Sequence, residues 1–384
     1  MRNIKNFAFM NVKIDKYRAD KILNIHKYVD SWFWEKYSAY PYKGCQFGCE
    51  FCYNREARYR PYEDPDDFSR VITIKENAAE LLRKELTKVP IDLVAIGDYQ
   101  PVERKYKLSR KMLEVCLDSG FPIFILERSP LVLRDLDILE DINKKSLAII
   151  AFSIITTKKS RNYSKLRFFE PKSPNVNRRF KAMKRISRKG ILTGTVFMPI
   201  LPYIYDDDRN IEEVIKKTIA NGGNFVVGGG LTLGRGYKKR YLNILEKIDP
   251  SLVSKYEILY PTYNVYGPDP KYYGEIAQKV AELCKKYEIS DRIPRPISFF
   301  PEKLRLNKKI AEIFFDNEYR LEIKNKSVYR AWAYRKAAWA LEDLEENVFE
   351  IYKEKGLKGL VGIKGIGDFF SRQIKKEIKK LISA

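Results

Sequence analysis

The sequence predicts an α/β protein in which repeated strand–helix units form a parallel sheet, closed into a barrel or partial barrel, followed by a small all-α domain. Short apolar runs alternate with helix-like stretches between residues 91 and 227, which is the pattern of a parallel sheet covered by helices. The composition changes after Pro301, where helical periodicity takes over. We expect an N-terminal extension at 1–37 that packs on the core, a barrel at 38–300 and a helical domain at 304–384.

The expected strands of the barrel are apolar and bounded by turn residues. Residues 91–97, with the sequence IDLVAIG, are typical of a strand that is buried on both faces. The full set of expected strands is 38–44, 91–97, 121–126, 147–155, 192–200 and 224–227. The expected helices between them are 75–88, 106–119, 131–143, 174–189 and 209–221.

Three of the five cysteines lie in one short segment after the first strand. Cys45, Cys49 and Cys52 have the spacing C-x3-C-x2-C, so their thiolates can converge on one metal centre from a single loop. An ordinary [4Fe–4S] cluster takes four cysteines. Three cysteines would leave one iron free to bind a small molecule, and Phe51 would add an apolar wall.

Other uses of these cysteines are possible from the sequence. A structural zinc site would need four Cys or His ligands, but the remaining candidates, His26, Cys116 and Cys284, lie far away in the sequence. A disulfide framework is disfavoured because five cysteines in 384 residues without a signal peptide are typical of a cytosolic protein. Three ordinary core cysteines are the third alternative.

Polar residues follow the expected strands, as at the active sites of barrel proteins. Three successive strands are followed by the segments DYQPVE (98–103), ERS (127–129) and SIITT (153–157). A Glu170-Pro171 pair comes next, and MPILP (198–202) ends the following strand. Turns and helix caps would also explain single cases, but the succession favours a ligand-binding cup beside the cysteine loop.

These segments, with the cysteine triad, resemble the spore photoproduct lyase-related branch of the radical S-adenosylmethionine (radical SAM) superfamily, often labelled DNA repair photolyases. The resemblance covers about residues 38–245 and implies a partial (β/α)6 barrel. It also implies a [4Fe–4S] cluster on Cys45, Cys49 and Cys52, S-adenosylmethionine on its open iron, and an external electron donor such as ferredoxin or flavodoxin. The family uses these groups to form a 5′-deoxyadenosyl radical that takes a hydrogen atom from the substrate.

The resemblance also implies roles for individual residues. Phe51 and Tyr53 would flank S-adenosylmethionine, Asp98 and Ser153 would hydrogen-bond its polar groups, and Arg128 would stand where the family usually has Lys. Tyr99 is a candidate radical relay, with packing on the cofactor as the alternative. Two positions depart from the family: Glu127 replaces the usual Thr, and Gly97 occupies the place of the hydrogen-donor cysteine of spore photoproduct lyases, which argues against spore photoproduct as substrate.

The charge balance predicts a polyanionic partner. Lys and Arg number 73 against 50 Asp and Glu, a net charge of +23. Residues 158–189 contain many cations and a single acid, Glu170. From this stretch we assign Arg167, Arg178 and Arg179 as nucleic-acid contacts, although a basic stretch can also be a solvated face.

The C-terminal residues 304–384 resemble the N-terminal domain of family X DNA polymerases, which binds a DNA backbone. The segment Gly362-Ile-Lys-Gly-Ile-Gly367 is typical of a helix-hairpin-helix, and YRAWAYRKAA (329–338) adds to the resemblance. Binding residues implied are Tyr334, Arg335, Lys336, Lys364, Gly365 and Gly367. The lyase Lys of that domain falls at Gln373, so binding without lyase chemistry is expected; a stabilising helical appendage is the alternative.

Together these features predict a cytoplasmic radical SAM enzyme that acts on nucleic acid, with DNA favoured over RNA and a repair- or lyase-like reaction. No apolar run reaches the length of a membrane span, so no membrane partner is expected. A radical SAM enzyme that modifies tRNA or another RNA is the first alternative. A non-catalytic nucleic-acid-binding protein with a structural metal is the second.

Overall fold

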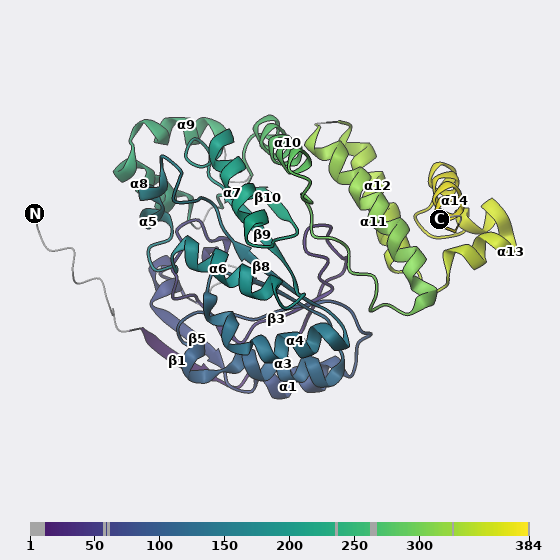
Figure 1. Ribbon diagram of the computed structural model, residues 1–384, viewed down its shortest axis with the longest axis horizontal. Coiled ribbons are helices and arrows are strands. Elements are labelled where there is room, and N and C mark those ends of the chain that lie inside the picture. Colours follow the sequence, from purple (N-terminus) through teal and green to yellow (C-terminus); the bar gives the residue numbers. More distant parts are fainter. Residues whose placement is uncertain are drawn as a thin grey trace, which may run out of the picture.

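The computed structural model describes residues 12–56, 59, 62–234, 237–261, 267–324 and 326–382. Figure 1 shows a sheet surrounded by helices, with the C-terminal helices forming a separate layer at one side. None of the helices in these ranges is long and apolar enough to cross a membrane.

The main sheet has seven strands in the order β10-β9-β8-β7-β6-β3-β2. Six neighbouring strands run parallel and in sequence order, and only β2 at the edge is antiparallel, where it pairs with β3. The strands are β2 Asn24–Ile25, β3 Tyr37–Ala39, β6 Val94–Ile96, β7 Ile123–Glu127, β8 Ala148–Ser153, β9 Leu192–Ile200 and β10 Val226–Gly230. This order confirms the predicted α/β class with a partial six-stranded barrel, which stays open between β10 and β2.

A small second sheet lies beside the barrel and was not predicted. β5 (Val71–Lys75) pairs in parallel with β1 (Lys13–Tyr17) and antiparallel with β4 (Tyr42–Lys43). The expected strand 38–44 is therefore divided between two sheets. Pro41 lies at the division, where it offers no backbone N–H to continue a ladder.

Helices cover the outer face of the main sheet. Apolar residues on these helices pack with the outward side chains of the strands in one large cluster. The helices are α1 Ala78–Leu86, α2 Glu103–Tyr106, α3 Leu108–Ser119, α4 Leu136–Lys145, α5 Leu166–Phe169, α6 Val176–Ser187, α7 Asp208–Ala220, α8 Lys238–Ile248, α9 Ser251–Leu259 and α10 Pro270–Lys286, with 3-10 turns at Tyr53–Arg55, Pro65–Ser69, Pro130–Asp135 and Tyr163–Lys165.

The inner face of the sheet is closed at the N-terminal ends of the strands. Trp34 is 1% exposed and its Nε1 donates a hydrogen bond to the carbonyl of Ile293. Phe33 stacks on Phe124 of β7, with ring centroids 5.3 Å apart. Residues before the barrel therefore fill its inner side near the N-terminal ends of the strands. The inner side near the carboxyl ends of the strands, beside the cysteine loop, remains open.

Four helices form the C-terminal region: α11 Glu302–Ile323, α12 Val328–Glu342, α13 Val348–Val361 and α14 Asp368–Ile382. Phe314 and Phe315 of α11 belong to the same apolar cluster as Trp34 and the inner face of the sheet. The helical character of this region agrees with the prediction of an all-α domain after Pro301.

Candidate functional site

The cysteine loop begins directly after β4 and is built by tight turns. Gly48 N–H donates to the Cys45 carbonyl, and Cys52 N–H donates to the Cys49 carbonyl. Gly48 has φ +61°, and a Cβ there would lie 3.1 Å from the Cβ of Ser69. Glycine is therefore needed at this turn, because other residues would be strained and crowded.

A buried arginine holds the cysteine loop in place through hydrogen bonds to backbone carbonyls. Arg55 is 1% exposed, and its guanidinium donates to the carbonyls of Cys49 and Gly48 at 2.9 Å each. A third bond of 3.1 Å reaches the Pro65 carbonyl. The planar five-donor fork of Arg suits three carbonyls at once, so Arg55 fixes the loop that carries the thiols.

Two glutamines join the cysteine loop to the end of β6. Gln46 N–H donates to Gln100 Oε1 at 2.9 Å, and Val102 N–H donates to Gln46 Oε1 at 2.6 Å. Gln100 Nε2 donates to the Gly44 carbonyl at 3.1 Å. The cysteine loop and the residues after β6 are consequently one rigid unit.

The three thiols lie close enough to interact electrostatically. Burial raises the pKa of Cys45, and Asp98, Cys49 and Cys52 raise it further. Burial, followed by Cys49, raises the pKa of Cys52 to about 11. Such thiols become thiolates only when a positive group approaches them.

The three thiols do not form a site for a single metal ion. Within the described ranges, no group of three or more His, Cys, Asp or Glu side chains is arranged to hold one metal ion. A single zinc ion would draw its thiolates to about 2.3 Å from one point, whereas cluster thiolates bind different irons and lie farther apart. The donor set, three soft thiolates on one short loop, fits a cluster with one iron that the protein does not ligate.

Arg128, from the end of β7, lies beside the thiols. Its guanidinium carbon lies 5.1 Å from the ring centroid of Phe51, and Nη1 donates to Glu170. Burial disfavours its charge, but Cys49, Glu170 and the other thiols outweigh that cost and raise its pKa. Arg128 thus supplies a fixed positive charge at the cluster loop.

Glu170 joins Arg128 to a second arginine. Arg179 is 1% exposed and donates to the second carboxylate oxygen of Glu170. It also donates to the carbonyl of Ser153 at 2.9 Å and, through two nitrogens, to that of Pro174. The assignment of Arg179 as a nucleic-acid contact is therefore corrected, because a guanidinium bonded inside the protein is not available to phosphate.

Asp98 follows the carboxyl end of β6, and Ser153 is the last residue of β8, as expected. Asp98 accepts from Gln100 Nε2 at 3.0 Å, and burial, followed by Glu127, raises its pKa well above the ordinary value. Ser153 is 4% exposed, and its hydroxyl donates to the Met198 carbonyl at 3.2 Å. Both side chains are positioned by internal bonds.

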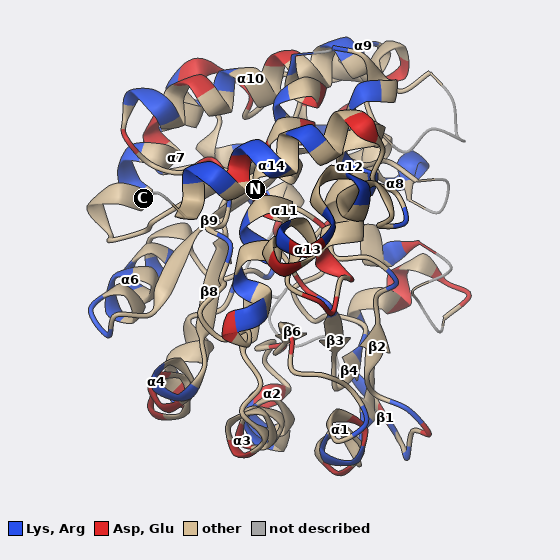
Figure 2. Ribbon diagram, turned by 90° about the vertical axis from the view of Figure 1, so that its right-hand side faces the viewer, with Lys and Arg blue, Asp and Glu red and all other residues tan. Residues whose placement is uncertain are grey.

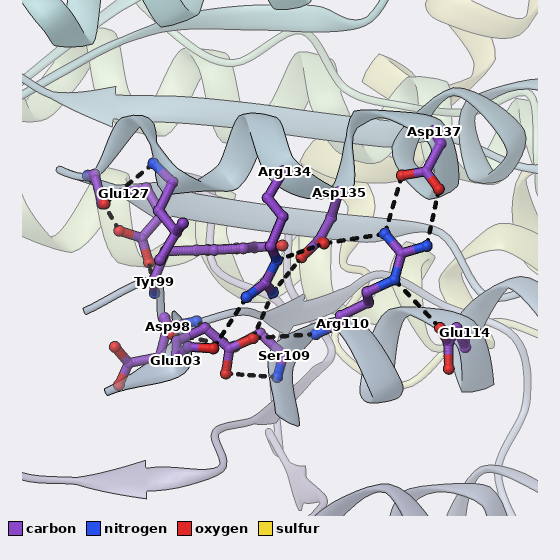
Figure 3. A network of polar contacts seen from close by, with 12 residues as sticks. Asp98, Tyr99, Glu103, Ser109, Arg110, Glu114, Glu127, Arg134, Asp135 and Asp137 are labelled. Carbon is purple, nitrogen blue, oxygen red and sulfur yellow. Dashed lines mark hydrogen bonds and ion pairs between the residues drawn. The ribbon is translucent and has the colours of Figure 1, made fainter. Parts of the chain in front are cut away.

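Tyr99 points away from the open inner side of the sheet. Its ring is 0% exposed, belongs to the outer apolar cluster and lies 5.8 Å from the guanidinium carbon of Arg134 (Figure 3). Arg134 also bonds Glu103 and Asp135, so the ring is enclosed by a network that stabilises the outer layer. This environment favours packing for Tyr99, and its candidate role as a radical relay stays a prediction.

Side chains around the open inner side remain exposed. Tyr53 is 57% exposed and Tyr40 is 42% exposed. Leu126 of β7 follows the inward Phe124 by two residues and is 40% exposed, although it is in the middle of a sheet. This exposure leaves room for a ligand between the cysteine loop and the aromatic floor.

A polar cluster on the first barrel strand was missed by the sequence reasoning. His26, the only histidine of the chain, lies 3.1 Å from Ser38 Oγ through Nε2 and 3.8 Å from Glu35 Oε1 through Nδ1. Burial, followed by Asp30, raises the pKa of Glu35 to about 8. The antiparallel pairing of β2 with β3 brings these residues together, and only that pairing could have revealed them.

A cavity of about 280 Å³ lies on the outer side of the cysteine loop. Arg240 of α8 donates to Glu50 at its wall, and Gly48, Arg70 and Lys172 line it as well. Mixed charges surround this cavity, which distinguishes it from the apolar inner side of the sheet.

The residues expected to bind nucleic acid have different environments. Arg167 and Arg178 are exposed. In the C-terminal region Lys336 and Lys364 are exposed, whereas Tyr334 packs against Phe370 with ring centroids 5.2 Å apart. Arg335 donates to Glu318 and Glu322, so carboxylates already neutralise its charge.

Comparison with known proteins decides the family. The model of the radical SAM superfamily matches residues 40–215, the segment that contains the cysteine loop and most strands. An uncharacterized protein of Methanocaldococcus jannaschii is 30% identical over 208 residues, which are 53% of this chain and 74% of the relative. The chain belongs to the radical SAM superfamily.

A further relative is similar in sequence, and two solved structures are similar in fold. An uncharacterized protein of Mycobacterium tuberculosis is 27% identical over 269 residues, 68% of this chain and 77% of the relative. A mutant of spore photoproduct lyase superposes with a TM-score of 0.52 at 14% identity, over 71% of this chain and 78% of that one. Another mutant of that enzyme, solved with S-adenosylmethionine and a dinucleoside spore photoproduct, has a TM-score of 0.51. Membership implies the cofactors of the superfamily, a [4Fe–4S] cluster and S-adenosylmethionine, as predicted.

Proposed function

We propose that this radical SAM enzyme acts on nucleic acid, with DNA as the preferred substrate, in a repair- or lyase-type reaction. Cys45, Cys49 and Cys52 would hold the cluster, whose open iron would bind S-adenosylmethionine. The cluster and S-adenosylmethionine together supply the ability to remove a hydrogen atom from an unactivated carbon. An external electron donor would reduce the cluster.

This chain's residues would bind and orient the cofactor. One Nη of Arg128 bonds Glu170, and among the described residues its guanidinium donates no other hydrogen bond. Its remaining N–H groups can therefore bind the carboxylate of S-adenosylmethionine in a two-pronged contact. Phe51 and Tyr53 would pack against the cofactor, and Asp98 and Ser153 would face its amino and hydroxyl groups.

The surface of α12 supports a nucleic-acid substrate. Tyr329 is 89% exposed and Trp332 is 45% exposed, and Lys336 follows with the spacing i, i+3, i+7, so the three share one helix face. Exposed aromatic rings beside cations are the composition of surfaces that stack bases and bind phosphates. This face is the observation that carries the proposal.

The glycine turn after α13 adjoins the same face. Gly365 has φ +95°, and a Cβ there would lie 3.8 Å from the carbonyl oxygen of Lys336. The turn leads into α14, whose first backbone N–H groups can donate hydrogen bonds to a phosphate oxygen, with Lys364 exposed nearby. We propose that Lys336, Lys364, Gly365 and Gly367 bind one stretch of backbone, as in a helix-hairpin-helix.

A second basic surface lies on the outer face of α6. Arg178, Lys181 and Lys184 are exposed there, and Figure 2 shows Lys and Arg along this helix and along α14. The C-terminal region packs at the N-terminal ends of the strands, whereas the cysteine loop lies near their carboxyl ends. We propose that the C-terminal region grips the polyanion and that a single-stranded or extruded nucleotide enters the open inner side of the sheet.

Spore photoproduct itself is not the proposed substrate. Gly97 has φ +98°, and a Cβ there would meet Ile125 at 3.3 Å and the ring of Tyr99 at 3.4 Å. A cysteine at this position would be strained and would point toward the outer layer. Return of a hydrogen atom must follow another route.

Binding at fixed salt concentrations tests the proposal. Duplex DNA, single-stranded DNA and tRNA are titrated against wild type, the Lys336→Ala/Lys364→Ala double variant and Lys111→Ala, an exposed control on α3. The double variant should weaken DNA binding and reduce the slope of log affinity against log salt by about 1.8 on duplex DNA, since each phosphate contact contributes about 0.9. Tight tRNA binding without DNA affinity would contradict the preference for DNA.

A further inference from the structure

Arg128 has two competing groups of anions within reach. The thiols of Cys49, Cys52 and Cys45, once ionised by a bound cluster, attract it electrostatically, and Glu170 Oε1 accepts a hydrogen bond from its Nη1. A flexible Arg side chain facing only the thiolates would move toward them, because Coulomb attraction between close charges is strong in a buried site. Its direction is therefore set by whatever opposes that attraction.

Glu170 provides the opposing charge, and it is unusually well fixed. Its side chain is 1% exposed, and each carboxylate oxygen accepts from a different arginine, Oε1 from Arg128 and Oε2 from Arg179. Burial opposes its ionisation, but the two guanidinium groups hold its pKa below the ordinary value. Glu170 is thus a carboxylate that stays ionised inside the protein.

Arg179 in turn is anchored to the backbone. Its guanidinium donates to the carbonyls of Ser153, the last residue of β8, and Pro174, which lies just before α6. These carbonyls cannot move without displacing the strand or the helix. The chain of bonds therefore transmits a fixed position from the sheet through Arg179 and Glu170 to Arg128.

The charges of this trio add to one positive charge. Arg128 and Arg179 contribute two and Glu170 removes one, which leaves a single cation to meet one carboxylate from a ligand. Without Glu170, two arginines would lie side by side in a buried site, and Arg128 would turn toward the thiolates.

We infer that Glu170 and Arg179 are positioning residues, which hold Arg128 away from the thiolates and aim its free N–H groups at the carboxylate of S-adenosylmethionine. Arg179, part of the basic stretch of the sequence, thereby acts inside the cofactor site. The inference rests on the proposed contact between Arg128 and that carboxylate, and it is independent of the nucleic-acid substrate.

Cofactor affinity of the reconstituted, anaerobic protein tests the inference. The dissociation constant of S-adenosylmethionine is measured by ultrafiltration for wild type, Glu170→Gln and Arg128→Ala. Glu170→Gln should weaken binding about 10- to 100-fold, the range expected when a charge-assisted contact is lost. Glu342→Gln is the matched control, because Glu342 is an equally buried carboxylate that bonds Arg295 and Lys308 far from the cysteine loop.

Decarboxylated S-adenosylmethionine separates positioning from simple loss of structure. It lacks the carboxylate, so wild type and Glu170→Gln should bind it equally, whereas general damage to the site would weaken both ligands. Should Glu170→Gln fail to fold around an unpaired Arg179, the Glu170→Gln/Arg179→Met variant removes both buried charges and should show the same selective loss.

The outcomes are distinguishable. Wild-type affinity of both Glu170 variants for S-adenosylmethionine, with weak binding by Arg128→Ala, would overturn the positioning role alone. Wild-type affinity of Arg128→Ala would remove the proposed cofactor contact itself.

Discussion

Replacing Arg55 with Lys should loosen the cysteine loop while keeping its charge. Arg55 donates three bonds, to the carbonyls of Cys49, Gly48 and Pro65. An ammonium group in the same space can keep about one of them, because its donors do not form a planar fork. Two lost bonds at about 1.5 kcal/mol each give about 3 kcal/mol.

This loss predicts a measurable change in cluster retention. If iron leaves through opening of the loop, a difference of about 3 kcal/mol increases the open population, and hence the release rate, about 100-fold. The assay follows iron transfer from anaerobically reconstituted protein to a chelator. Arg110→Lys is the control, because Arg110 pairs with the buried Asp135 and the exposed Asp137 in the outer layer (Figure 3). Equal release rates for Arg55→Lys and wild type would refute this role of Arg55.

Three further predictions concern the same site. Cys49→Ala should abolish uptake of about four irons per chain and cleavage of S-adenosylmethionine without changing far-ultraviolet circular dichroism; retained cleavage would exclude the cysteine triad as ligand set. Burial raises the pKa of Glu35 in the folded state to about 8, so the wild type loses stability as pH rises from about 4.5 to about 8. Glu35→Gln should therefore be increasingly more stable than the wild type across this pH range, and a difference in urea midpoint that does not change with pH would contradict this. Gly97→Ala should destabilise the protein by about 1–3 kcal/mol, since φ +98° disfavours a Cβ; an unchanged urea midpoint would show that the backbone relaxes there.

Much of the barrel could be predicted because its strands are buried on both faces. The run IDLVAIG and the strand Ala148–Ser153 are continuously apolar, and such runs between helical stretches indicate a parallel sheet. The small second sheet was missed because Val71–Lys75 has only five residues and pairs with strands outside the repeated strand–helix pattern, Lys13–Tyr17 and Tyr42–Lys43.

The site was predictable where chemistry is local in sequence. Three cysteines within eight residues and the polar strand ends required no knowledge of tertiary contacts. The orientation of Tyr99 and the burial of Arg179 could not be predicted, since adjacent residues in a basic stretch, Arg178 and Arg179, differ only in which side of α6 they occupy. The contact between His26 and Glu35 depends on pairing of β2 with β3, which the sequence pattern does not reveal.

The most direct test of the proposed function is transfer of deuterium from a nucleic acid. DNA and RNA are prepared from cells grown on deuterated medium, with and without ultraviolet irradiation. Each sample is incubated anaerobically with the reconstituted enzyme, reductant and S-adenosylmethionine. The deuterium content of the 5′-deoxyadenosine formed is then measured by mass spectrometry. The account predicts deuterium in 5′-deoxyadenosine from a DNA sample. Formation of 5′-deoxyadenosine without deuterium from any DNA, or deuterium from RNA alone, would contradict it.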